Sequence, residues 1–152
     1  MHSAVLILHS WVRWIVIAAG LHAAARGLLG ASRNAPWTPG DDRAGFWFVT
    51  AMDLQLTIGL VLYLFLSPYA AAALHNLSAT MKDPVLRFWA VEHAFGMLVA
   101  VTLVHVGRVR ARRTDSLRRH RITAIFYGLA LVAILVSLPW PGSAHARPLL
   151  RW

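Results

Sequence analysis

Cysteine is absent from the 152 residues, and acidic residues are scarce, at six against fifteen lysines and arginines. Without cysteine the chain can form no disulfide, no iron–sulfur cluster and no thiolate zinc site. Any metal must therefore be held by histidine, methionine or carboxylate side chains. Charged residues make up only 14% of the sequence, whereas hydrophobic residues make up 58%. This is the composition of a membrane protein rather than of a soluble domain.

The net charge of +9 does not indicate nucleic-acid binding, because most of the arginines lie between apolar segments. A hydrocarbon core of about 30 Å needs about 20 apolar residues per helix, so four spans use nearly the whole chain. We therefore expect residues 1–152 to form a single transmembrane domain in a lipid bilayer, with no nucleic-acid partner. The amino terminus lacks the basic start of a signal peptide, so we expect the first helix to be retained.

The predicted fold is all-α, a polytopic membrane four-helix bundle. Apolar runs predict spans at about 4–25, 46–66, 85–106 and 122–138. Ser67-Pro68 should end the second span, Asp83-Pro84 should begin the third, and Pro139 should end the fourth. Residues 26–45 are rich in Gly, Pro and Asp and predict a loop. Residues 70–81 are too polar to span and predict a short interfacial helix.

Charge predicts the orientation of the bundle. Residues 107–121 contain seven arginines and one aspartate, so the positive-inside rule puts this stretch in the cytoplasm. With four spans, both termini then lie on the outer, periplasmic side of a bacterial inner membrane. The first and third helices run in parallel, from outside to inside.

Two pairs of histidines lie at matched depths on these parallel helices. At about 1.5 Å per residue, His9 and His93 lie roughly 8 to 12 Å below the outer surface, while His22 and His105 lie near the inner surface. Two imidazoles facing each other across a bundle suit the axial positions of a b-type haem. A metal site with further ligands and a proton relay are alternatives. For His22 and His105, a purely interfacial role is a further alternative.

The number of haems follows from helical angles. Thirteen residues separate His9 from His22 and twelve separate His93 from His105, so neither spacing keeps both histidines on one helix face. We therefore predict one haem at His9 and His93, with His22 and His105 as candidates for a second haem or an inner site.

Other ionisable residues in the spans need partners, because each costs about 2.5 to 3.5 kcal/mol on insertion scales. Arg13 lies one turn from His9 and should bind Glu92, Asp53 or a haem propionate. Arg87, near the start of the third span, is better placed for a propionate. Asp53 and Gln55 are candidates for a proton site or a quinone site.

The segments LHSWVRW, DLQLTIG and MKDPVLRFWAVEH resemble a family of small four-helix bacterial membrane proteins described as cytochrome b-like. The resemblance extends over most of the chain and implies a b-type haem on His9 and His93, leaving His22 and His105 outside the matching stretches. With such a haem, the leading hypothesis is an electron-transfer protein or subunit that exchanges electrons with quinol, as a homodimer or within a larger membrane redox complex.

Two alternatives remain open for the function. One is a haem-dependent membrane oxidoreductase similar to the four-helix protoporphyrinogen oxidases, which pair a first-helix histidine with haem. The other is a haem-free structural or assembly subunit. The chain leaves little room for a separate catalytic site, which favours an electron-transfer role over a stand-alone enzyme.

Overall fold

The computed structural model describes residues 2–150, and every regular element among them is helical. Four helices are long and apolar enough to cross a membrane, which confirms the predicted all-α fold and its four helices of membrane-spanning length. Their bounds are α1 (His2–Ser32), α2 (Pro39–Val61) with the π-helical turn η1 (Leu62–Leu66), α5 (Pro84–Arg87) with the π-helical turn η2 (Phe88–Glu92) and α6 (His93–Arg112), and α7 (Ser116–Val136).

The breaks between helices follow local sequence signals, as predicted. The second span ends at Leu66, where Pro68 begins a new helix that is capped by the Ser67 hydroxyl. The third span begins at Pro84, and the Asp83 carboxylate caps it by accepting hydrogen bonds from the next backbone N–H groups, of Val85 and Leu86, at 2.8 Å. These caps satisfy amides that have no partner within the helix.

The loop predicted for residues 26–45 is shorter than expected, and only residues 33–38 are non-helical. α1 continues to Ser32 because Gly27 and Gly30 pack closely on α7. α2 begins at Pro39 through a capping box between Thr38 and Asp41. The Arg26 Nε donates to Asp41 Oδ1 at 2.7 Å and ties the two helix ends together.

The interfacial segment predicted for residues 70–81 is helical but divided. It forms α3 (Pro68–His75) and α4 (Leu77–Lys82), separated by Asn76. The Asn76 side chain accepts a hydrogen bond from Ala79 N at 3.0 Å and so starts the second of these helices.

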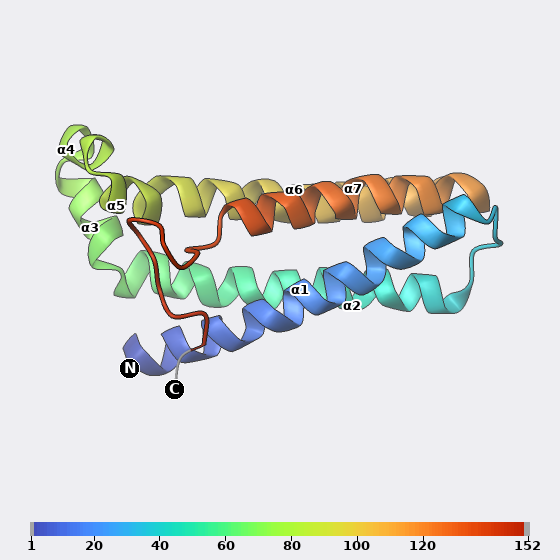
Figure 1. The fold of residues 1–152 in the computed structure, drawn as a ribbon, viewed down its shortest axis with the longest axis horizontal. Coiled ribbons are helices and arrows are strands. Elements are labelled where there is room, and N and C mark those ends of the chain that lie inside the picture. Colours follow the sequence, from blue (N-terminus) through green and yellow to red (C-terminus); the bar gives the residue numbers. More distant parts are fainter. Residues whose placement is uncertain (1, 151–152) are drawn as a thin grey trace.

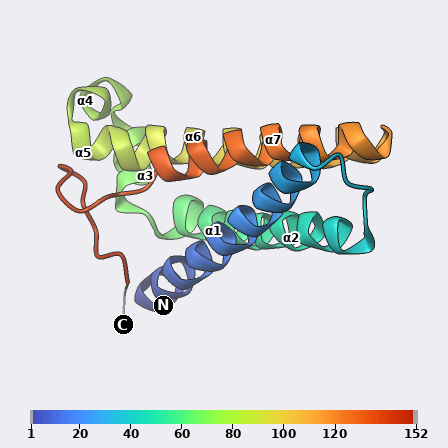
Figure 2. The ribbon, with the colours of Figure 1, turned by 45° about the vertical axis from the view of Figure 1, so that its right-hand side comes forward.

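The long helices form a bundle in which α1 and α6 are diagonal. α1 packs on α2 and α7, and α6 packs on the same two helices. Figures 1 and 2 show α1, in blue, crossing its neighbours obliquely, so that its first turns stand apart from α6 and α7. The segment after α7, residues 138–150, is called here the C-terminal segment and runs across this opening (Figure 1). The bundle is therefore splayed at the end where α1 begins, called here the N-terminal end.

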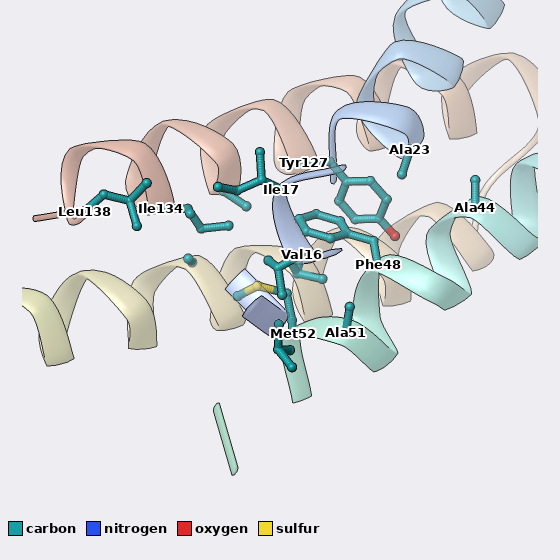
Figure 3. Packing of buried hydrophobic residues seen from close by; sticks show 14 of the residues in the cluster. Val16, Ile17, Ala23, Ala44, Phe48, Ala51, Met52, Tyr127, Ile134 and Leu138 are labelled. Carbon is teal, nitrogen blue, oxygen red and sulfur yellow. The ribbon is translucent and has the colours of Figure 1, made fainter. Parts of the chain in front are cut away.

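The core lies where α1, α2 and α7 converge. Figure 3 shows Val16 and Phe48 beside Tyr127, and the Phe48 and Tyr127 rings meet edge to face with centroids 5.2 Å apart. α1 approaches closely here because a side chain at Gly20 would collide with the Phe48 ring. Small residues at such contacts are typical of packed membrane helices. This packed core fixes the angle at which α1 crosses the bundle, and at that angle the first turns of α1 lie away from α6.

Candidate functional site

His9 lies on the splayed part of α1 and faces α2. The Gln55 side-chain amide donates to the His9 backbone carbonyl at 3.1 Å and lies 3.2 Å from the His9 ring Nε2. The other ring nitrogen, Nδ1, is buried and has no hydrogen-bond partner among residues 2–150. Gly59 gives the ring its space, since a Cβ there would lie 3.2 Å from His9 Cε1. Because an amide N–H can only donate, Nε2 is the acceptor and Nδ1 carries the proton of the neutral ring, without a partner in the described part of the chain.

His93 is oriented in the same manner from the diagonal helix. It is the first residue of α6, directly after the π-helical turn η2, a feature that often occurs at functional sites. Its Nδ1 lies 2.8 Å from the backbone carbonyl oxygen of Ser137, at the end of α7. Because a carbonyl can only accept, Nδ1 carries the proton, and Nε2 keeps its lone pair for a ligand.

Two adjoining cavities lie at the N-terminal end of the bundle, with volumes of about 70 Å³ and about 270 Å³. Both are lined by His9 and His93, together with Leu6, Trp89 and Arg147. The smaller cavity reaches towards Arg13, Gln55 and Met97, and the larger one towards Tyr63 and Tyr69. The sequence-predicted pair of histidines therefore shares one pocket region between the diagonal helices.

The C-terminal segment brings backbone and cationic groups to this region. Arg13 donates to the Leu149 carbonyl, and Trp14 Nε1 donates to the same oxygen at 3.0 Å. Arg147 donates to the Tyr69 hydroxyl and lies over the Trp89 ring, 5.5 Å from its centroid. Two guanidinium groups thus lie at the cavity wall, one from α1 and one from the C-terminal segment.

The carboxylates expected near Arg13 are held by other residues. Glu92 accepts from Arg87 Nε at 2.6 Å, and Arg87 also donates to the Met81 carbonyl; both side chains of this ion pair are partly exposed. Arg87 is absent from the described walls of both cavities. The arginine that does reach the cavities besides Arg13 is Arg147, which the sequence analysis did not single out.

The remaining predicted site residues do not gather in the same way. His105 Nε2 lies 2.8 Å from Asp53 Oδ1, with both side chains about half exposed, at 46% and 50%. His22 is exposed on α1. Asp53 and Gln55 lie on opposite faces of α2: the Asp53 side chain is exposed, whereas Gln55 is buried against His9. The structure therefore gives His22 and His105 no common pocket among the cavities described above.

Residues that the sequence analysis did not assign to the site also contribute to it. Ser137 acts through its backbone carbonyl, which no sequence pattern could mark, and Arg147 lies in a stretch that the sequence presents as a tail. His120 lies in the arginine-rich stretch 107–121 but is 1% exposed on α7, where it packs against Gly30 and lies 4.9 Å from the Trp37 ring centroid. The last turns of α1 and the loop after it cover it, which is why it is buried.

No protein-family model, characterised protein or solved structure matches this chain. Among residues 2–150, no group of three or more His, Asp and Glu side chains could hold a metal ion. An axially ligated macrocycle needs only two protein ligands, and two histidines line these cavities.

Proposed function

We propose that this chain is a b-type cytochrome-like electron-transfer protein or subunit that binds one haem b through His9 and His93. The observation that carries the proposal is that both histidines line the same cavities from diagonal helices, each with one ring nitrogen beside a protein group. Histidines on two diagonal helices could bind a haem iron from opposite sides.

The donor set fits such a group. Histidines that bind metals usually pair their other nitrogen with a carbonyl or carboxylate, which sets the tautomer and the ring orientation. The Ser137 carbonyl has this role at His93, and the Gln55 amide orients His9. The buried Nδ1 of His9 has no partner among residues 2–150. Because the Gln55 amide donates to Nε2, the lone pair that iron would take lies on Nε2.

The surroundings also fit a flat, dianionic macrocycle. Trp89 offers an aromatic wall, and Arg13 and Arg147 offer two cations suited to the propionates. Pockets for cofactors typically enclose about 300–1,000 Å³, and the larger cavity, at about 270 Å³, lies just below that range. Arg147 and Pro148 of the C-terminal segment line the smaller cavity, so a shift of this segment would enlarge the space without moving one of the long helices.

When bound, haem supplies a one-electron carrier whose potential depends on the axial ligands, hydrogen bonds and burial. Gln55 and Ser137 would hold the two imidazoles in place, Arg13 and Arg147 would balance the propionate charge, and the apolar side chains around the cavities would exclude water. Quinol is the expected small-molecule electron partner. Gln55 is buried against His9, which favours a role for it in orienting the ligand over one in binding a quinone.

The ratio of haem to protein tests this proposal. The purified chain in mild detergent should contain one haem b per chain by the pyridine haemochrome assay. His9→Ala and His93→Ala should each remove most of it, whereas His22→Ala and His105→Ala should leave the ratio unchanged. Equal loss in all four variants, or two haems per chain, would contradict the assignment to the His9 and His93 pair.

A further inference from the structure

The end of the bundle where α6 leads into α7 is strongly basic, and it lies opposite the N-terminal end (Figure 1). The carboxylates at this end are all held by arginines of the chain, in the pairs Asp41–Arg26, Asp42–Arg108 and Asp115–Arg118, at 2.7, 3.0 and 3.6 Å. Further arginines there have no carboxylate partner among residues 2–150: Arg33, Arg43, Arg110, Arg112, Arg113, Arg119 and Arg121. The positive charge at this end is therefore only partly balanced within the chain.

Four of the arginines continue exposed rows of apolar side chains. Along α6 and its C-terminal cap, exposed residues follow one another at steps of three, four or seven and so share one helix face: Phe95, Val99, Val106, Arg110 and Arg113. Along α7, exposed residues follow the same steps: Arg118, Arg121, Ile125, Leu129 and Val132. The positive-inside rule asks only for arginines on one side of the membrane, so it does not explain why these four are aligned with apolar rows.

The two rows lie beside each other because α6 and α7 pack closely. A Cβ at Gly107 would lie 2.5 Å from the Phe126 Cβ on α7, so the two backbones nearly touch at this level. The guanidinium carbon of Arg110 lies 5.5 Å from the centroid of the Phe126 ring, which shows that the α6 row leans towards α7. The two rows thus form one surface, called here the α6/α7 surface, which is apolar along the span and basic at one end.

The basic end of this surface lies at the depth of lipid phosphates. The third span, Pro84–Arg112, has 29 residues and is about 43 Å long at about 1.5 Å per residue. A bilayer with its head groups is about 40–45 Å thick, so Arg110 reaches the head-group level. Arg118 and Arg121, in the first two turns of α7, lie at the same end. A guanidinium group binds a phosphate through two parallel N–H···O hydrogen bonds.

We propose that the α6/α7 surface binds an anionic phospholipid, with its phosphate at the four arginines of the two rows and its acyl chains along the apolar residues. Charge complementarity favours this occupant, because Asp115 is the one carboxylate that contacts these arginines in the described part of the chain. A zwitterionic head group would bring its own cation to the same guanidinium groups. A soluble phosphate compound or a nucleic acid would use the arginines and leave the apolar rows uncovered.

Lipid titration followed by native mass spectrometry tests the site on the full chain, purified in dodecyl maltoside. Dioleoyl phosphatidylglycerol should bind at least about tenfold more tightly than dioleoyl phosphatidylcholine, which has the same chains. Glycerol 3-phosphate, which has a phosphate but no chains, should not displace the bound lipid, and neither should a short oligonucleotide. Equal affinity for the two lipids, or displacement by either soluble compound, would overturn the proposal.

Paired substitutions locate the lipid on the protein. Arg110→Gln with Arg121→Gln should lower the affinity for phosphatidylglycerol about 10- to 30-fold, because both groups lie at the membrane surface. Arg113→Gln with Arg118→Gln leaves the contact between Arg110 and Phe126 intact and should lower the affinity by a similar factor. Circular dichroism should show the same helix content in each variant as in the wild type.

Arg33→Gln with Arg112→Gln is the matched control, since it removes the same charge from the same end of the bundle. Both side chains are exposed and lie outside the two rows: Arg33 follows α1, and Arg112 is seven residues after His105, on the side of α6 that contacts α2. This variant should bind phosphatidylglycerol as the wild type does. Equal losses in the control and in the row variants would contradict a site on the α6/α7 surface. None of these readouts depends on haem.

Discussion

The Nδ1 of His93 lies 2.8 Å from the backbone carbonyl oxygen of Ser137, joining the first residue of α6 to the end of α7. This contact decides which nitrogen of His93 faces the cavities. It depends on the close approach of the two helices at Gly96, where any Cβ would collide with the Ser137 hydroxyl. The orientation of His93, a proposed haem ligand, therefore depends on Gly96, one turn away on the same helix.

Gly96→Ala tests this coupling. The Ser137 hydroxyl can rotate away from the added methyl group, but the Ser137 Cβ would lie 3.0 Å from it, so we expect the end of α7 to shift slightly and lengthen the contact between the Ser137 carbonyl and His93. Loss of a group that orients a ligand typically lowers metal affinity about 10- to 100-fold, and we expect haem to be lost faster by about that factor. The measurement is the rate of haem transfer to excess apomyoglobin. Gly128→Ala, where the new Cβ meets nothing within 4 Å, is the control and should lose haem at the wild-type rate.

Gln55→Leu removes the amide that orients His9 while keeping a side chain of similar size. The variant should also lose haem about 10- to 100-fold faster, because the His9 ring is then free to rotate. Asp53→Asn changes the opposite face of the same helix and should leave the rate unchanged. If Gln55→Leu lost haem no faster than the wild type and the Asp53→Asn control, Gln55 would have no role in orienting His9.

Gly27→Ala tests the packing that lets α1 extend past its predicted end. A Cβ at Gly27 would lie 2.8 Å from the backbone nitrogen of Ala124 on α7. Overpacking of this kind typically costs about 1–3 kcal/mol, so the variant should unfold at a lower temperature in detergent. Gly128→Ala adds a Cβ in open space, and alanine is the better helix former by roughly 0.5–1 kcal/mol. Similar melting temperatures for the two variants would contradict this account of the helix contact.

The orientation of the bundle remains a prediction from arginine placement and can be tested with cysteine variants. Thr114→Cys lies between α6 and α7, and Ser78→Cys is exposed on α4, at the opposite end of the bundle. In spheroplasts, a membrane-impermeant maleimide should label Ser78→Cys at once and Thr114→Cys only after permeabilisation. The reverse labelling pattern would show that the positive-inside interpretation is wrong for this chain.

The sequence predicts those features of the fold that depend on local signals. The four spans, the break at Ser67-Pro68 and the start at Asp83-Pro84 follow from apolar length, proline geometry and capping, all of which act over a few residues. The helix ends near residues 26–45 were misplaced because they depend on long-range packing. Glycines usually mark loops, but Gly27 and Gly30 are helical here, since they allow α1 to press against α7.

The same distinction applies to the candidate site. Counting residues along parallel helices was enough to match His9 with His93, because depth in a membrane is nearly linear in sequence. Their partners were not predictable in this way: Gln55 and Ser137 contact them across 46 and 44 residues of sequence. Arg147 reaches the cavities only because the C-terminal segment folds back over α1, and no periodicity marks that path.

The reduced-minus-oxidised visible spectrum of the purified chain, recorded beside His93→Ala, tests the central claim most directly. The account predicts the α and β bands of a low-spin, bis-histidine b-type haem in the wild type. These bands should be absent from His93→Ala, with helix content unchanged. A wild-type protein that is folded, expressed with an adequate haem supply and still without these bands would contradict the account.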